Sequence, residues 1–208
     1  CDQHNIRIIS VEKNGSTAFA VYGYMNRGAH EGEVGVDIYY YDIEKNVVQE
    51  KAFIPSTKSF AIAEEELGKM VYYNQDQNLL YILAGGKFYK IDLTKDEQTV
   101  LAKNLEEGQY TVSADGHLIA YQTSGTINTA QEIKVLNLKT DEENAVAAKS
   151  GEAIRPLGFI GSDFVYGYLR QEDVGHTAAG GELFPMYELE IRNSENEVMK
   201  TYSADKIY

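Results

Sequence analysis

The sequence predicts an all-β chain built from repeated four-stranded units. Short runs rich in Val, Ile, Tyr and Phe recur along all 208 residues, and residues typical of turns separate them. The tetrapeptide Val21-Tyr22-Gly23-Tyr24 returns as Val165-Tyr166-Gly167-Tyr168. Only three prolines occur, and Pro55 and Pro185 fall at the boundaries of runs, where a missing backbone donor costs little. Together these three observations favour sheets throughout the chain.

We expect sixteen of these runs to be strands. In chain order they are 6–11, 17–25, 34–42, 47–54, 70–74, 78–83, 87–93, 98–102, 109–113, 117–123, 132–138, 145–149, 153–160, 163–170, 186–193 and 197–202. Each group of four runs makes one unit, so the units are expected at about 5–54, 70–102, 109–149 and 153–203.

The spacing of the repeat indicates how these units are arranged. The two tetrapeptides are 165 − 21 = 144 residues apart. Over three units this gives a period of roughly 48 residues, within the range of β-propeller blades. The second run of a unit, such as 79–83, is apolar on both faces, as a strand needs when neighbouring sheets cover its sheet on both sides. The fourth runs are more polar, which suits an outer edge. A β-sandwich, covered on one face only, is the alternative, and the pattern favours the propeller.

One segment carries a family resemblance. Residues 113–121, Ser-Ala-Asp-Gly-His-Leu-Ile-Ala-Tyr, resemble the Ser-Pro-Asp-Gly-x-x-Ile-Ala-Tyr element between the first two strands of blades in TolB-like propellers, a repeat class akin to WD40 propellers. Lys87 to Glu97 resembles the hairpin that follows in such blades. Ala114 replaces the usual proline, and the other three units keep only the apolar pattern. The resemblance implies a propeller fold and a role as a binding platform rather than as a catalyst.

Composition limits the classes of function. With 43% hydrophobic and 25% charged residues, the chain has the composition of a globular protein, and we predict a single propeller domain over residues 1–208. The formal charge of −13 disfavours nucleic acid as a partner. A single cysteine allows no internal disulfide and no cysteine zinc cluster.

The two ends of the sequence suggest two further expectations. Cys1 followed by Asp2 is how a mature bacterial lipoprotein begins, which predicts an extracytoplasmic protein that meets the membrane only through a lipid on Cys1. The alternative is that residue 1 is an arbitrary start. Lys206-Ile207-Tyr208 resembles the opening of another first strand, so we expect an incomplete propeller that self-associates through its ends.

Signatures of catalysis and of cofactor binding are missing from the sequence, so we expect no catalytic residue, cofactor or metal. His30-Glu31-Gly32-Glu33 comes nearest to a metal cluster, but adjacent residues on a loop lack fixed geometry and a solvated loop is favoured. The same holds for His176 in the glycine-rich segment 175–181. Most of the 16 tyrosines are expected to pack between blades.

Loop lengths indicate a candidate binding face. In a propeller the loop between the second and third strands and the loop to the next blade emerge together, and here these are the long ones: 26–33, 55–69, 103–108, 124–131 and 171–185. Their excess of acidic residues includes the run 64–66. The candidate ligand-binding residues on this face are Arg27, His30, Glu31, Glu33, Arg170, Glu172, Asp173 and His176.

The predicted function is a non-enzymatic, extracytoplasmic binding module for a protein, peptide or glycan. Two alternatives stay open from the sequence. One is a propeller-fold hydrolase or lyase with its active site at the centre of the long-loop face, and the other is the regulatory part of a larger enzyme. A central cluster of His, Arg and carboxylates would favour an enzyme, whereas an aromatic surface would favour binding.

Overall fold

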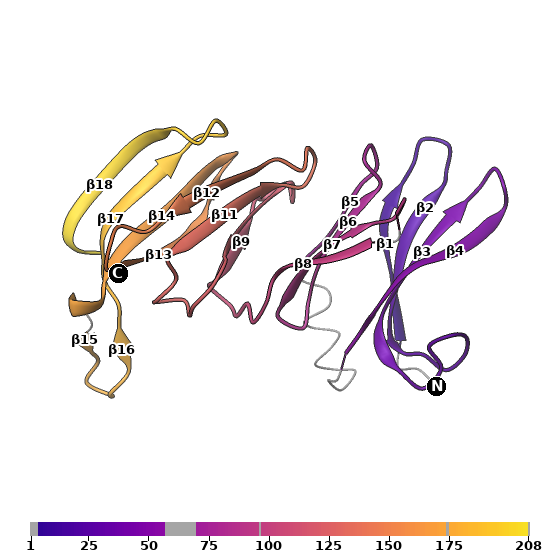
Figure 1. The fold of residues 1–208 in the computed structure, drawn as a ribbon, viewed down its shortest axis with the longest axis horizontal. Coiled ribbons are helices and arrows are strands. Elements are labelled where there is room, and N and C mark those ends of the chain that lie inside the picture. The colour runs from indigo at the N-terminus through magenta and orange to yellow at the C-terminus, as the bar shows by residue number, and fades with distance from the viewer. Residues whose placement is uncertain (1–3, 57–69, 96, 174, 208) are drawn as a thin grey trace. The chain divides into compact units, whose positions relative to one another are not determined.

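The computed structural model describes residues 4–56, 70–95, 97–173 and 175–207, and the chain divides into two compact units, Cys1–Leu101 and Ala102–Tyr208. Each unit holds two four-stranded antiparallel sheets in which every strand pairs with the next strand of the sheet (Figure 1). Within the described residues, helical structure is limited to one 3₁₀ turn, η1 (Gln171–Asp173). The predicted all-β class is therefore confirmed, and the described strands form four-stranded antiparallel sheets in the order predicted for propeller blades.

Unit 1 contains the first two sheets. The β1–β4 sheet consists of β1 (His4–Val11), β2 (Thr17–Tyr24), β3 (Val34–Asp42) and β4 (Val47–Pro55). The β5–β8 sheet consists of β5 (Met70–Asn74), β6 (Leu79–Ala84), β7 (Lys87–Asp92) and β8 (Glu97–Ala102).

Unit 2 contains the other two sheets and a small hairpin. The β9–β12 sheet consists of β9 (Tyr110–Val112), β10 (Leu118–Gln122), β11 (Glu132–Asn137) and β12 (Glu143–Ala147). The β13–β18 sheet consists of β13 (Glu152–Ile160), β14 (Asp163–Arg170), β17 (Met186–Arg192) and β18 (Val198–Ile207). The two-stranded hairpin of β15 (Gly175–His176) and β16 (Glu182–Leu183) extends from one end of the unit (Figure 1).

The core of unit 1 lies between its two sheets. Val36 and Ile38 of β3 pack in one cluster with Leu80 and Ile82 of β6. All six residues of β6 are buried, as expected for a strand whose sheet is covered on both faces. The outer strand β4, in contrast, begins with four exposed residues, so the exposed outer edge predicted for fourth strands is found here.

The core of unit 2 is aromatic. Tyr166 and Tyr168 of β14 join Ile133 of β11 and Ile154 of β13 in one cluster. Tyr81, Tyr121 and Tyr166 all have exposed fractions of 0%, whereas Tyr24 and Tyr202 are 40% and 57% exposed, so the predicted burial of tyrosines holds for only some of them. A second connection between the sheets of this unit is polar, since the buried Gln122 side chain donates from Nε2 to the backbone oxygen of Ile154 at 2.8 Å.

The hairpins between third and fourth strands share one turn chemistry. The Oδ1 atom of Asp42 accepts bonds from the backbone of residues 44 and 45, and that of Asp92 accepts from residues 94 and 95. Asn137 does the same for residues 139 and 140. Such Asx turns reverse the chain without help from distant residues. The predicted equivalence of these segments therefore has a local cause.

The segment 113–121, which resembles the TolB-like element, contains a closed turn. Ser113 Oγ donates to Asp115 Oδ1 at 2.6 Å, and Asp115 Oδ1 accepts from the backbone N of His117 at 3.1 Å. Gly116 has φ of 74°, a conformation that glycine adopts without strain.

Two features of unit 2 differ from the predictions. The segment 171–185, expected to be one loop, contains the β15–β16 hairpin. The expectation that Lys206 and Ile207 open a new strand is wrong, because both belong to β18 and Ile207 pairs with Met186. A register shift between Met186 and Glu188 lets the pairing of β17 with β18 continue as far as Ile207. A bulge of this kind has no local signature in the sequence.

Candidate binding site

The predicted candidate His30 is held against a sheet rather than solvated with its loop. Its ring stacks on Phe53 with centroids 3.8 Å apart, its Nε2 lies 3.0 Å from Glu50 Oε1, and its Nδ1 lies 3.4 Å from Glu33 Oε1. The loss of hydration lowers the pKa of His30, but the two carboxylates outweigh it and the net pKa is raised. Arg27 and Glu31 of the same loop are exposed.

A buried carboxyl group lies behind His30. Asp37 is 2% exposed, and its Oδ2 accepts a hydrogen bond from the Tyr39 hydroxyl. Its Oδ1 has no hydrogen-bond partner among the described residues. Burial raises the pKa of Asp37, the Tyr39 bond opposes this, and the nearby Glu50 adds to the rise. The four groups His30, Asp37, Tyr39 and Glu50 therefore form one coupled cluster on the β1–β4 sheet.

In unit 2 the predicted candidates are spread along the long connection between β14 and β17. Arg170 Nη1 lies 4.0 Å from Asp173 Oδ2, and its guanidinium carbon lies 3.8 Å from the centre of the Tyr187 ring. Glu172 is exposed, and His176 is exposed in β15. The structure thus brings Arg170 and Asp173 together and leaves His176 in the hairpin.

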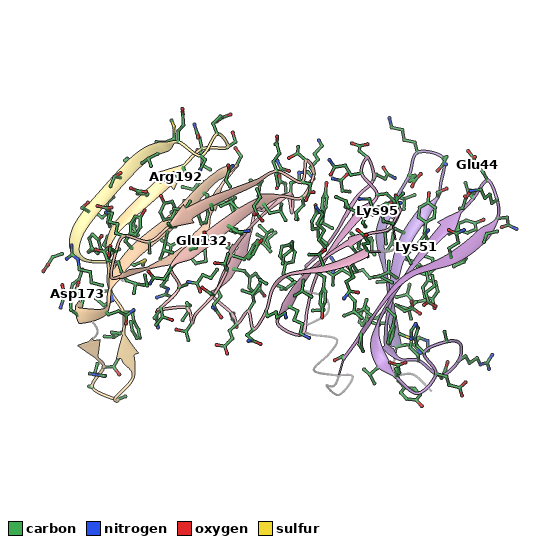
Figure 2. The ribbon with its side chains drawn as sticks, in the orientation of Figure 1. Glu44, Lys51, Lys95, Glu132, Asp173 and Arg192 are labelled. Carbon is green, nitrogen blue, oxygen red and sulfur yellow. The ribbon has the colours of Figure 1, made fainter. Side chains whose placement is uncertain are left out.

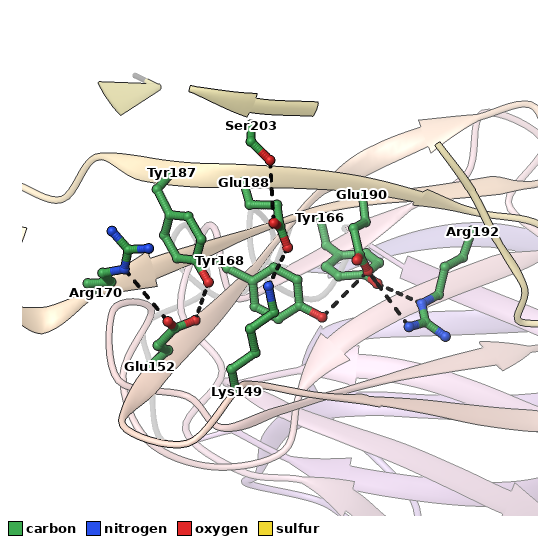
Figure 3. Close-up of polar contacts among 10 residues, drawn as sticks. All are labelled: Lys149, Glu152, Tyr166, Tyr168, Arg170, Tyr187, Glu188, Glu190, Arg192 and Ser203. Atoms are coloured by element: carbon green, nitrogen blue, oxygen red, sulfur yellow. Dashed lines mark hydrogen bonds and ion pairs between the residues drawn. The ribbon is translucent and has the colours of Figure 1, made fainter. Parts of the chain in front are cut away.

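A row of polar contacts crosses the inner face of the β13–β18 sheet, the face turned toward the β9–β12 sheet (Figure 3). Near Arg170, Glu152 accepts a hydrogen bond from the Tyr187 hydroxyl at 2.5 Å. Further along, Lys149 donates to Glu188 at 2.5 Å. Desolvation lowers the pKa of Lys149, but the interactions with Glu188 and Tyr187 together outweigh it, so the net pKa is raised. The four charged side chains here are paired, Arg170 with Glu152 at 3.7 Å and Lys149 with Glu188.

The row ends at Arg192. Its Nε donates to the Tyr166 hydroxyl at 2.6 Å, and its Nη1 donates to the backbone oxygen of Asn196 at 3.0 Å. Glu190 accepts a hydrogen bond from Tyr166 and lies 3.7 Å from Arg192 Nη2. Burial and the Glu190 contact raise the pKa of Tyr166, so this phenol stays protonated. These bonds hold the guanidinium in a fixed orientation.

Arg192 also lines a pocket of about 420 Å³ between the two sheets of unit 2. Leu118, Val135 and Phe164 supply apolar surface to the pocket. Its polar lining comes from the turns at this end of the unit and from β12: Asn137, Glu142, Asn144, Ser162, Arg192, Asn193, Ser194, Glu195 and Asn196. We call this cavity the unit 2 pocket.

The unit 2 pocket lies at the end of unit 2 opposite the long loops. Figure 2 shows Asp173, near the β15–β16 hairpin, and Arg192 at different ends of the unit. None of the eight residues predicted for ligand binding lines it. The sequence feature that could have indicated this pocket is the clustering of Asn and Glu at the turns 137–142 and 193–196. These residue types are also common in turns, so their presence did not by itself indicate a binding site.

Some of the predictions concern residues that the structure does not describe. Cys1 and the acidic run 64–66 are outside the described part of the chain. Among the residues that the structure does describe, no group of three or more His, Cys, Asp or Glu could hold a metal ion. In the same residues, no helix is long and apolar enough to span a membrane.

No family model and no curated protein matches the chain. Solved structures with similar folds include TolB from Acinetobacter baumannii, with 16% identity and a TM-score of 0.36 over 94% of this chain and 42% of that one. The tricorn protease has 16% identity and a TM-score of 0.37 over 89% of this chain and 17% of that one. The β-propeller domain of the Trilobed protease from Pyrococcus furiosus has 11% identity and a TM-score of 0.38 over 97% and 57%.

The chain therefore spans about half or less of the length of TolB and the tricorn protease, and somewhat more than half of the Trilobed protease domain. Its antiparallel four-stranded sheets and the Ser-Ala-Asp-Gly turn provide the evidence for the fold independently of these scores. At the level of fold, the chain resembles the TolB-like β-propellers.

Proposed function

We propose that the chain is a non-enzymatic binding module that acts outside the cytoplasm and takes a protein, peptide or glycan ligand, with the unit 2 pocket as the contact site. The observation that carries the proposal is the composition of this pocket. A volume of about 420 Å³ with apolar surface and several convergent polar groups is typical of a ligand site.

The polar groups indicate what the ligand offers. Asn side chains donate and accept hydrogen bonds, while Glu142 and Glu195 accept them. The lining can therefore bind both the donors and the acceptors of a ligand that carries hydroxyl or amide groups. Arg192 is already oriented by Tyr166 and Asn196, so little side-chain entropy is lost when a ligand meets it. An extended peptide or a sugar has this mixture of polar groups and apolar surface.

The test begins with ligand selection. The purified chain is screened on a glycan array and against a displayed random-peptide library, and the best binder is measured by isothermal titration calorimetry. Two serine variants then locate the site. Ser194 is exposed in the turn beside the pocket, and Ser150 is exposed in the turn at the other end of unit 2.

We expect Ser194→Trp to weaken binding at least about tenfold, because an indole at the mouth fills the space that the ligand needs. Ser150→Trp adds the same group away from the pocket and should leave the affinity unchanged. Failure of both screens, or a binder insensitive to Ser194→Trp, overturns the proposal. Location outside the cytoplasm is tested separately by fractionation of cells that express the protein.

A further inference from the structure

We propose that a second copy of this chain docks head-to-tail, with the outer face of its β13–β18 sheet against the outer face of the β1–β4 sheet. The outer face is the one turned away from the other sheet of the same unit. The two faces carry opposite charges in their central rows and exposed apolar side chains around them, and neither includes a residue of the unit 2 pocket.

The acidic face belongs to the β1–β4 sheet. Cross-strand pairing places Asp37 in one row with Ile6, Val21 and Phe53. The next row holds Ile8, Phe19, Tyr39 and Glu50. Ile6 and Ile8 are 60% and 64% exposed, an unusual degree for neighbouring isoleucines on one strand.

Charge on this face is only partly compensated. Asp37 Oδ1 lacks a hydrogen-bond partner among the described residues, and the nearby Glu50 side chain is 39% exposed. His30 contacts Glu50 at 3.0 Å and, when protonated, places one positive charge beside these carboxylates. A basic surface placed over this face would therefore gain electrostatic energy.

The basic face belongs to the β13–β18 sheet. One row consists of Arg155, Gly167, Leu189 and Tyr202, and the next consists of Gly158, Val165, Ile191 and Lys200. Arg155 is partly buried, and its Nε has no hydrogen-bond partner among the described residues. Lys200 is exposed, and Tyr202 is 57% exposed.

The rows of the two faces match in character. Each face offers aromatic and aliphatic side chains at the spacing of adjacent strands. The exposed charge is Glu50 on one face and Lys200 on the other, and the buried Asp37 and the partly buried Arg155 have the same signs as these two residues. Glu50 and Lys200 lie on the outermost strands of their sheets. Because the faces differ from each other, the association is heterologous, and each copy can use both faces.

The experiment exchanges the charges of the two outer strands. Sedimentation velocity over a concentration series measures self-association of the unaltered chain, of Glu50→Lys and of Lys200→Glu. Lys200 is exposed, and the exposed Glu50 gives up its surface contact with His30 in Glu50→Lys, so each change should alter the melting temperature by a few degrees at most. Each single variant places like charges across the interface and should weaken association at least about tenfold.

Mixing provides the decisive measurement. In an equimolar mixture of the two variants, the altered β1–β4 face of the Glu50→Lys chain can meet the altered β13–β18 face of the Lys200→Glu chain. The charges on the two outer strands are then opposite again, so association should return. Glu97→Lys with Lys103→Glu makes the same charge changes at exposed positions outside both faces and should not alter association. A monomer at all concentrations, or single variants that associate normally, overturns the proposal, as does a mixture that stays monomeric. None of these results depends on a ligand in the unit 2 pocket.

Discussion

The side-chain amide of Gln122 links two sheets, since its Nε2 donates to the backbone oxygen of Ile154 at 2.8 Å. The same nitrogen lies 3.0 Å from the Ile127 oxygen, and Gln122 Oε1 accepts from Gln109 at 3.0 Å. Gln122 is 1% exposed and Gln109 3%. A polar group in such a position stabilises the fold only while all its bonds are made.

Replacing this amide should destabilise unit 2. Gln122→Leu removes the donor for two carbonyl oxygens and the acceptor for Gln109, so we expect a loss of about 2–4 kcal/mol in the free energy of unfolding. Urea denaturation monitored by tyrosine fluorescence measures it. Gln49→Leu, at an exposed position of β4, is the control and should change stability by less than about 0.5 kcal/mol. Equal effects of the two variants would contradict the argument.

A matched pair of glycine variants tests the close packing of the β1–β4 sheet. A Cβ at Gly35 would lie 2.4 Å from the backbone oxygen of Ile54 and 2.8 Å from the Phe53 ring. A Cβ at Gly158 would meet nothing within 4 Å. Gly35→Ala should therefore cost about 1–3 kcal/mol, and Gly158→Ala should be nearly neutral. Thermal unfolding of both variants gives the comparison. An unchanged stability of Gly35→Ala would show that β3 and β4 can move apart at this position to accommodate the methyl group.

The contacts of His30 predict a dependence of stability on pH. Because the pKa of His30 is raised in the folded state, the folded protein holds this proton more tightly than the unfolded chain. The stabilisation is present below the ordinary pKa of 6.5 and is lost as pH rises through the folded value. Denaturant midpoints between pH 5.5 and 8.5 should fall less for His30→Gln than for the unaltered protein.

The control for this prediction is His176→Gln, because His176 is exposed in the β15–β16 hairpin. This variant should follow the pH profile of the unaltered protein. Asp37 acts in the same direction at lower pH, because its raised pKa also makes the folded state bind its proton more tightly. The His30 contribution is therefore read above pH 5.5. Identical pH profiles for His30→Gln and the unaltered chain would disprove the contribution of the His30 contacts with Glu50 and Glu33 to stability.

The acidic loops give a prediction about charge steering. Changing Glu31, Glu33, Glu172 and Asp173 together to Ala should slow the association of a cationic probe, decalysine, at low salt, since exposed charges act mainly on association rates. Stopped-flow measurements at 20 and 200 mM salt compare the two proteins, and the difference should shrink at the higher salt. Thermal stability should be nearly unchanged, because Glu31 and Glu172 are exposed and the other two residues make only long contacts, at 3.4 and 4.0 Å. Equal rates at low salt would exclude these loops as the steering surface.

The sequence by itself determined the strands, their grouping by four and the repeated turns. Apolar alternation and Asx turns act between residues a few positions apart, so Asp42, Asp92 and Asn137 could be recognised as equivalent without any tertiary contact. The tight turn at Asp115 and Gly116 is local in the same way. The buried β6 strand was evident because its apolar run leaves no polar face.

Only the tertiary structure decided which polar groups meet. His30 reaches Glu50 across 20 residues, Arg192 reaches Tyr166 across 26, and Gln122 reaches Ile154 across 32. The unit 2 pocket likewise combines residues from 118 to 196. Such contacts depend on strand register, and the shifts in β13, β17 and β18 move side chains past their expected partners. Because register is set by the packing of whole sheets, no local pattern in the sequence could reveal these sites.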